Sequence, residues 1–195
     1  MKRLLLFLLL ITPVAIASAT DISNGDFESK RKLDPSEVSS FASQQWKVPA
    51  DNMIFFDWKP NLSQPGEYEC ISETALCHDG EGCLYLKGTF LSNTPFPTSQ
   101  RPAEVTVTLW VRSRDDSKKD FTVSLYFYQS SYAFLKELTV QDECNKDWTK
   151  ITKTFEVPSS VDSVAGPKKV DLFVVAVGTH MGCLFDDVTV EMKGH

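Results

Sequence analysis

The chain has 195 residues, and its 26 acidic side chains outnumber 20 basic ones to give a net charge of −6. That length suffices for one domain with a substantial hydrophobic core. The acidic balance argues against binding of nucleic acids or anionic membrane surfaces, because both need basic patches. It suits neutral ligands and cations.

The N-terminus, MKRLLLFLLLITPVAIASAT, has the three parts of a secretory signal peptide. Lys2 and Arg3 form a positive start, an apolar run covers residues 4–11, and small residues at 15–19 offer cleavage sites. The apolar run is shorter than the roughly 20 residues that span a bilayer. We therefore predict a signal peptide at residues 1–19 and a single domain at 20–195. The product is expected to be secreted, extracellular or periplasmic, without membrane insertion.

Cysteines are the next feature of the mature chain. There are five, at Cys70, Cys77, Cys83, Cys144 and Cys183. Disulfides are the default in an exported protein, and an odd number leaves at least one thiol unpaired within the chain. The spacing has no Cys-x-x-Cys pair, so one or two structural bridges are favoured over a metal–thiolate site. The sequence leaves their connectivity open.

Apolar and polar residues alternate through most of the chain from residue 83 onward. In EVTVTLWVRS, at 104–113, Trp110 and Arg112 lie on the polar side, and in FTVSLYFYQ, at 121–129, Tyr126 and Tyr128 do. Similar alternation covers 83–90, 148–157, 168–177 and 184–192. This period, with many β-branched and aromatic residues, predicts half-buried strands.

Turn-forming clusters separate these segments, and no amphipathic helix is expected after the signal peptide. The polar, serine-rich stretch 29–45 predicts a loop or a short helical turn. Many short strands with turns between them favour an antiparallel sandwich or barrel, in one domain without internal repeats.

Five segments, in chain order, resemble motifs of secreted carbohydrate-binding modules with the galactose-binding-like jelly roll, families 4, 9 and 22 and their relatives. They are NGDFES at 24–29, GEGCLYLKG at 80–88, VTVTLWVRS at 105–113, KDWTKITKTFEVP at 146–158 and VDLFVVAVGTHMGCLFDDVTVE at 170–191. The resemblance implies an all-β, two-sheet antiparallel jelly-roll β-sandwich that binds a glycan or polysaccharide. The cysteines, the insertion at 29–52 and the lack of an attached catalytic domain depart from the pattern.

The same resemblance implies a structural calcium ion where the first and last strands approach each other. Mapped onto this chain, its acidic ligands are Glu28 and Asp186, with Asp26 and Asp187 in reserve. Calcium prefers six to eight oxygen ligands from carboxylates and carbonyls, which suits acids at two chain ends. The alternative is that these acids are solvated strand ends or that Glu28 meets a lysine.

Sugars stack their C–H surfaces on aromatic rings and hydrogen-bond through their hydroxyls. The polar sides of the two clearest strands, with a tryptophan from the connection FFDWKPN, supply a candidate ligand face. Its members are Trp58, Trp110, Arg112, Tyr126 and Tyr128. Trp110 and Tyr126 form one platform if their strands are neighbours in one sheet. The alternative is that these rings seal the core or pack under a loop.

Catalysis is not expected, because the sequence lacks a nucleophile elbow and a histidine pair with metal-binding spacing. The alternative function is an extracellular adhesion or surface-structural domain that binds a cell-surface protein. This alternative is based on the MAM domains of cell-surface proteins. They are also jelly rolls, and they show the patterns D-F-E, F-D-W and D-D-V together with cysteines, as this chain does.

Overall fold

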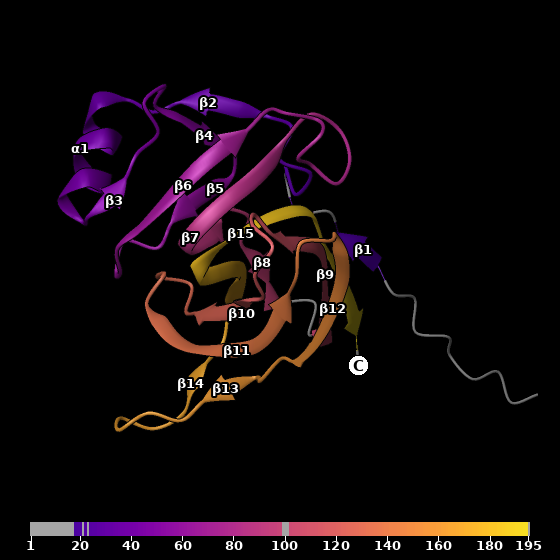
Figure 1. Ribbon diagram of the computed structural model, residues 1–195. Helices are drawn as coiled ribbons and strands as arrows, with labels where there is room; N and C mark the ends of the chain where they lie inside the picture. The colour runs from indigo at the N-terminus through magenta and orange to yellow at the C-terminus, as the bar shows by residue number, and fades with distance from the viewer. Residues whose placement is uncertain (1–17, 21, 23, 99–101, 195) are drawn as a thin grey trace, which may run out of the picture.

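The computed structural model describes residues 18–20, 22, 24–98 and 102–194 (Figure 1). The predicted signal peptide therefore lies outside the described residues, apart from its last two positions. Strands account for most of the described chain: β1 Ser18–Thr20, β2 Lys30–Lys32, β3 Trp46–Lys47, β4 Met53–Phe55, β5 Trp58–Pro60, β6 Gly66–Ile71, β7 Cys83–Ser92, β8 Phe96–Pro97, β9 Pro102–Ser113, β10 Lys119–Tyr128, β11 Phe134–Cys144, β12 Thr149–Glu156, β13 Ser160–Val161, β14 Lys168–Lys169 and β15 Leu172–Gly194.

The only helix among the described residues is α1, Pro35–Ser43, within the stretch predicted as a loop or short helical turn. Asp34 caps it: its carboxylate accepts hydrogen bonds from the backbone N–H groups of Ser36 and Glu37, and the Glu37 carboxylate accepts from the Asp34 N–H. This reciprocal capping box, with proline at the first helical position, starts a helix efficiently. Phe41 is the residue that α1 buries. The described helix is not long and apolar enough to cross a membrane.

The last strand, β15, organises the fold because it takes part in two layers. Residues 172–178 pair with β10 on one side, and residues 176–179 pair with β7. The register then shifts between Thr179 and Cys183, and residues 183–194 pair with β9. Beyond these neighbours, β11 pairs with β10, β6 with β7, and β12 with β9. All of these pairings are antiparallel.

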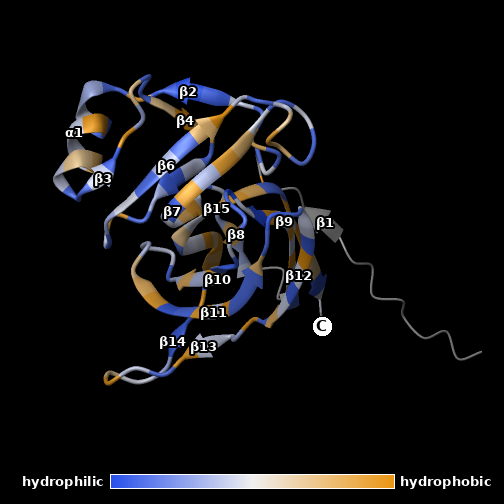
Figure 2. Ribbon diagram, viewed as in Figure 1, coloured by the Kyte–Doolittle hydropathy of each residue, from blue (hydrophilic) through white to orange (hydrophobic). Residues whose placement is uncertain are grey.

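The two layers enclose one hydrophobic core. The residues at 105, 107, 109 and 111 of β9 and those at 121, 123, 125 and 127 of β10 are all buried in it. Figure 2 shows the alternation of hydrophilic and hydrophobic residues along these strands. The predicted all-β antiparallel β-sandwich is therefore confirmed. The only parallel pairing in the described part of the chain joins β3 to β6.

The smaller elements lie at opposite ends of the molecule (Figure 1). A two-stranded pairing of β2 with β4 adjoins α1, and the β13–β14 hairpin projects beyond β11. The strand β1 pairs with residues 190–192 of β15, so the N-terminal and C-terminal segments lie together.

Candidate functional site

The two acidic motifs from opposite ends of the chain meet in the folded protein. The Val188 N–H donates to the Gly25 carbonyl at 2.8 Å. A Cβ at Gly25 would lie 2.1 Å from the Val188 carbonyl oxygen, so the approach requires a glycine here. This meeting is the one that the resemblance to carbohydrate-binding modules implied.

A loop of residues 78–82, between β6 and β7, receives acids from both motifs. The Glu28 Oε1 atom accepts from the backbone N–H groups of Glu81 at 2.7 Å and Gly82 at 3.0 Å. The Asp186 Oδ2 atom accepts from the His78 N–H at 2.9 Å. These two carboxylates, the first pair of predicted calcium ligands, therefore hold the same loop.

Asp186 is the most unusual of the four acids. Its side chain is fully buried, and burial raises its pKa to about 7, with the charge of Asp187 adding to the effect. Backbone N–H donors, with His78 first among them, oppose this rise. No lysine or arginine among the described residues pairs with Asp186 or with Glu28. A buried carboxylate without a cationic partner is costly, so a bound cation would suit this position.

The reserve pair, Asp26 and Asp187, also lies at this junction. Both line one surface hollow together with Gly25. Asp187 also has a positive φ of 49° and contacts His78 Nδ1 through Oδ2 at 2.8 Å. Across the described residues, no group of three or more histidine, cysteine or acidic side chains is arranged to hold a metal ion. Any ion here would need backbone carbonyls to complete its ligands.

The placement of Trp58 corrects the prediction that it contacts a ligand. Trp58 has no exposed surface, and its indole Nε1 donates to the Asn24 carbonyl at 3.0 Å. Its ring lies 5.1 Å from that of Phe27, measured between centroids. The connection that carries it folds inward as β5 and pairs with β7, so the tryptophan joins the core instead of overhanging a sheet.

Trp110 and Arg112 lie on the outer side of β9, as the alternation predicted, but the 78–82 loop covers this area. The His78 ring stacks on Trp110 with centroids 3.7 Å apart. The Arg112 guanidinium lies over the ring of Trp148 at 5.5 Å, and Arg112 Nε is buried without a hydrogen-bond partner. These rings support the packing alternative more than an open binding face.

Tyr126 and Tyr128 lie on the outer side of β10, away from Trp110. The strands β9 and β10 pair with different parts of β15, so the predicted platform of Trp110 and Tyr126 is wrong. Both tyrosines contact Phe134 of β11, with centroid distances of 5.9 and 5.8 Å. Phe134 is 55% exposed.

We call this surface the tyrosine face: Tyr126, Tyr128 and Phe134, which lie beside the small apolar cluster of Leu91, Val174 and Ala176. Burial raises the pKa of Tyr126, and a hydrogen bond with Glu137 raises it further. Sequence reasoning missed Phe134, because the segment 134–144 was not recognised as a strand, and missed His78, which no local pattern marks as a ring-stacking residue.

Several solved structures are similar to this chain at low sequence identity. An arabinose-bound α-L-arabinofuranosidase, MgGH51, has a TM-score of 0.54 and 14% identity over 89% of this chain and 26% of its own. The CBM22-1 xylan-binding domain of Xyn10C from Paenibacillus barcinonensis has a TM-score of 0.49 and 7% identity, covering 76% of this chain and 90% of that one. A CBM4 structure reaches 0.45 at 15% identity over 88% and 99%. No family model and no curated protein sequence matches the chain.

Proposed function

We propose that this protein is a non-catalytic carbohydrate-binding module and that the tyrosine face is its ligand site. The observation that carries the proposal is a group of three aromatic rings on the outer side of a sheet, beside the core and not within it. Partly exposed aromatic rings of this kind offer flat apolar surface for the C–H faces of sugar rings.

Polar groups on the same side of β10 and β11 as these rings suit the hydroxyls of a neutral sugar chain. Thr122 of β10 and its partner Gln141 on β11 lie there, whereas Ser124 is buried and its hydroxyl already bonds to that of Thr139 at 2.8 Å. Glu137 lies opposite Tyr126 in the same register. Hydroxyl, amide and carboxylate groups supply donors and acceptors. The net charge of −6 disfavours anionic polysaccharides, so the proposed ligand is a neutral one.

Binding to a set of neutral polysaccharides tests the proposal, with xylan, the ligand named for one solved structure of similar fold, included in the set. Tyr126→Ala and Tyr128→Ala should each weaken binding about thirtyfold, because truncation of a central interface aromatic commonly costs about 2 kcal/mol. Phe56→Ala is the matched control: Phe56 is also an exposed aromatic, 44% exposed, but lies in the β4–β5 turn.

The melting temperature of each variant must be measured beside its affinity. Normal melting with weakened binding supports the site. Normal affinity in both tyrosine variants would remove the tyrosine face from consideration. No binding to any glycan, together with capture of a cell-surface protein, would favour the adhesion alternative.

We propose also that Glu28 and Asp186 hold a structural calcium ion with backbone carbonyls. The burial of the Asp186 carboxyl without a cationic partner supports this, as does the convergence of both acids on the 78–82 loop. The ion would compensate the charge and stabilise the junction of the chain ends. A ligand that binds only the folded state adds about 2.7 kcal/mol at a hundredfold excess over its Kd.

Thermal unfolding in calcium and in chelator, at matched ionic strength, tests this site. Calcium should raise the melting temperature of the wild type, and Asp186→Asn or Glu28→Gln should abolish the difference. Asp162→Asn, a change of an exposed acid elsewhere, should retain it. Equal melting of the wild type in both buffers would remove the site.

Export of the chain is part of the same proposal and rests on the signal-peptide pattern. Cleavage after Ala17 would keep all of β1, whereas cleavage after Ala19 would leave only Thr20 of its three residues. N-terminal sequencing of protein collected from the medium or periplasm distinguishes the two. Retention of Met1 in cell-associated protein would contradict export.

A further inference from the structure

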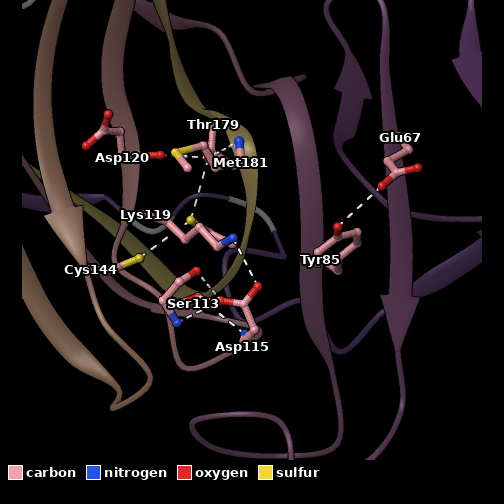
Figure 3. Close-up of polar contacts among 11 residues, drawn as sticks. Glu67, Tyr85, Ser113, Asp115, Lys119, Asp120, Cys144, Thr179 and Met181 are labelled. Atoms are coloured by element: carbon pink, nitrogen blue, oxygen red, sulfur yellow. Dashed lines mark hydrogen bonds and ion pairs between the residues drawn. The ribbon is translucent and has the colours of Figure 1, made fainter.

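Four of the five cysteines lie in two close pairs. Cys144 ends β11, and Cys183 lies in β15 at the point where its register shifts. Their Sγ atoms are 3.5 Å apart, and both residues are buried. Figure 3 shows Cys144 in this region, with Lys119 and Thr179 nearby. The two residues are 39 positions apart in the chain, so the fold and not the local sequence brings them together.

The second pair brackets the 78–82 loop. The thiols of Cys77 and Cys83 lie close enough for each to affect the pKa of the other. Both are buried, in a small cluster with Ile71 and Leu184. Six positions separate the two cysteines, so a bond between them would close the loop at its base.

Cys70 is different from the other four. Its Sγ lies 3.6 Å from the Met53 carbonyl oxygen, so its thiol faces a backbone carbonyl and not another sulfur. Burial raises the pKa of Cys70 to about 12, which keeps it a thiol at neutral pH. The fifth cysteine, which has no partner in the two pairs, is therefore Cys70, and it lies on the side of β6 that meets β4.

We propose that the oxidised protein contains two disulfides, Cys144–Cys183 and Cys77–Cys83, and that Cys70 remains a free thiol. A disulfide needs its sulfur atoms about 2.05 Å apart, so the thiols of Cys144 and Cys183 need to approach by only about 1.5 Å. Both bridges join residues that the fold already holds together, and neither requires a change of strand register.

The chemistry is thiol–disulfide exchange with a small disulfide such as oxidised glutathione. One protein thiolate attacks the small disulfide and releases one thiol, and the second protein thiolate then attacks the mixed disulfide and releases the other. Two protein thiols are oxidised, one small disulfide is reduced to two thiols, and the two protons pass to the products. Cys144 and Cys183 are buried in the folded domain, so this exchange takes place during folding, while both thiols are still accessible.

The two bridges have different structural effects. Cys144–Cys183 would tie the end of β11 to the point where β15 passes from one layer to the other. Cys77–Cys83 would close the loop whose backbone holds Glu28 and Asp186 and whose His78 covers Trp110. Reduction should therefore lower the melting temperature of the whole domain, and loss of the second bridge alone should loosen mainly this loop.

Thiol counting in the wild type, refolded in a glutathione redox buffer, tests the connectivity. Alkylation in denaturant should trap one thiol per chain, and a non-reducing digest should yield the two predicted linked peptides. Cys70→Ser is the matched control and should give no thiols and the same two linked peptides. Cys144→Ser should give two thiols, Cys70 and Cys183, and keep the other bridge.

The disulfide assignment does not depend on whether Cys144→Ser folds, because the wild type and Cys70→Ser alone decide it. Five thiols in the refolded wild type would overturn the proposal. A linked peptide that contains Cys70, or any bridge between the two pairs, would overturn it as well.

Discussion

Replacement of Trp58 tests whether this tryptophan is a core residue or contacts a ligand, the two roles that the sequence left open. The side chain has no exposed surface, its ring packs against Phe27, and its indole N–H satisfies the Asn24 carbonyl. Truncation to alanine removes the ring and leaves a cavity, a change that costs about 3–5 kcal/mol. It also removes one of the two hydrogen bonds that the Asn24 carbonyl accepts, a loss of about 0.5–1.5 kcal/mol, while the bond from the Phe27 N–H at 3.2 Å remains.

Trp58→Phe divides the effect into its parts. Phenylalanine retains most of the packing against Phe27 but removes the N–H donor, so we expect a loss nearer to the cost of the hydrogen bond. Natural domains are stable by about 5–15 kcal/mol, so the alanine variant should lose a large part of its free energy of unfolding.

Urea unfolding, followed by tryptophan fluorescence and circular dichroism, measures these losses. With an m-value of about 2 kcal/mol/M, the midpoint of Trp58→Ala should fall by roughly 2 M. Phe56→Ala, two positions earlier and exposed, should change the free energy of unfolding by no more than about 0.5 kcal/mol. An unchanged midpoint in Trp58→Ala, with loss of polysaccharide binding, would refute the core assignment.

Two further predictions concern the 78–82 loop and an ion pair. A Cβ at Gly82 would lie 2.1 Å from the Phe27 carbonyl oxygen, so Gly82→Ala should lower the melting temperature. A Cβ at Gly194 would have no heavy atom within 4 Å, so Gly194→Ala should leave the melting temperature unchanged. Equal melting temperatures of the two variants would contradict the close approach at Gly82. The Lys153 ammonium hydrogen-bonds the carboxylate of Asp142 at 2.5 Å and holds its pKa below the usual 3.8. The pair is partly exposed, so Asp142→Asn should cost less than about 1 kcal/mol near neutral pH. Because the pKa of Asp142 is lowered in the folded state, the contribution of the pair to the free energy of unfolding should be present above pH 3.8 and vanish as the pH falls through the lowered pKa. A stability difference between the wild type and Asp142→Asn that persists in acid would mean that charge pairing is not its cause.

The strands were predictable because burial on one side of a sheet imposes a period of two. Val105, Val107 and Leu109 show it clearly, and they lie in the core as expected. The segment 134–144 was missed because it lies at the edge of its layer, where most side chains are exposed and the alternation is weak. For residues 29–45 the composition predicted only a loop or a short helical turn, whereas the local signal for α1 is its capping box, Asp34 followed by proline and then Glu37.

Site residues were less predictable, since their positions depend on contacts between distant segments. The meeting of the two acidic motifs followed from their resemblance to known modules, but the loop that both motifs hold did not. Alternation placed Tyr126 on an outer surface, yet it did not reveal that Trp110 faces outward from a different layer. For Trp58 there was no alternation to read, because β5 has only three residues and follows a tight turn.

The shared use of β15 makes the order in which the chain is synthesised important for folding. The 23 residues of β15, Leu172–Gly194, lie between β10 and β7 in one layer and between β7 and β9 in the other. A nascent chain that ends before residue 172 lacks the inner strand of both layers and leaves one edge each of β7, β9 and β10 unpaired. Unpaired edges invite association with other chains. The domain can therefore reach its native state only after residues 172–194 have been synthesised, and termination before them is expected to give aggregation-prone fragments and not a smaller stable domain.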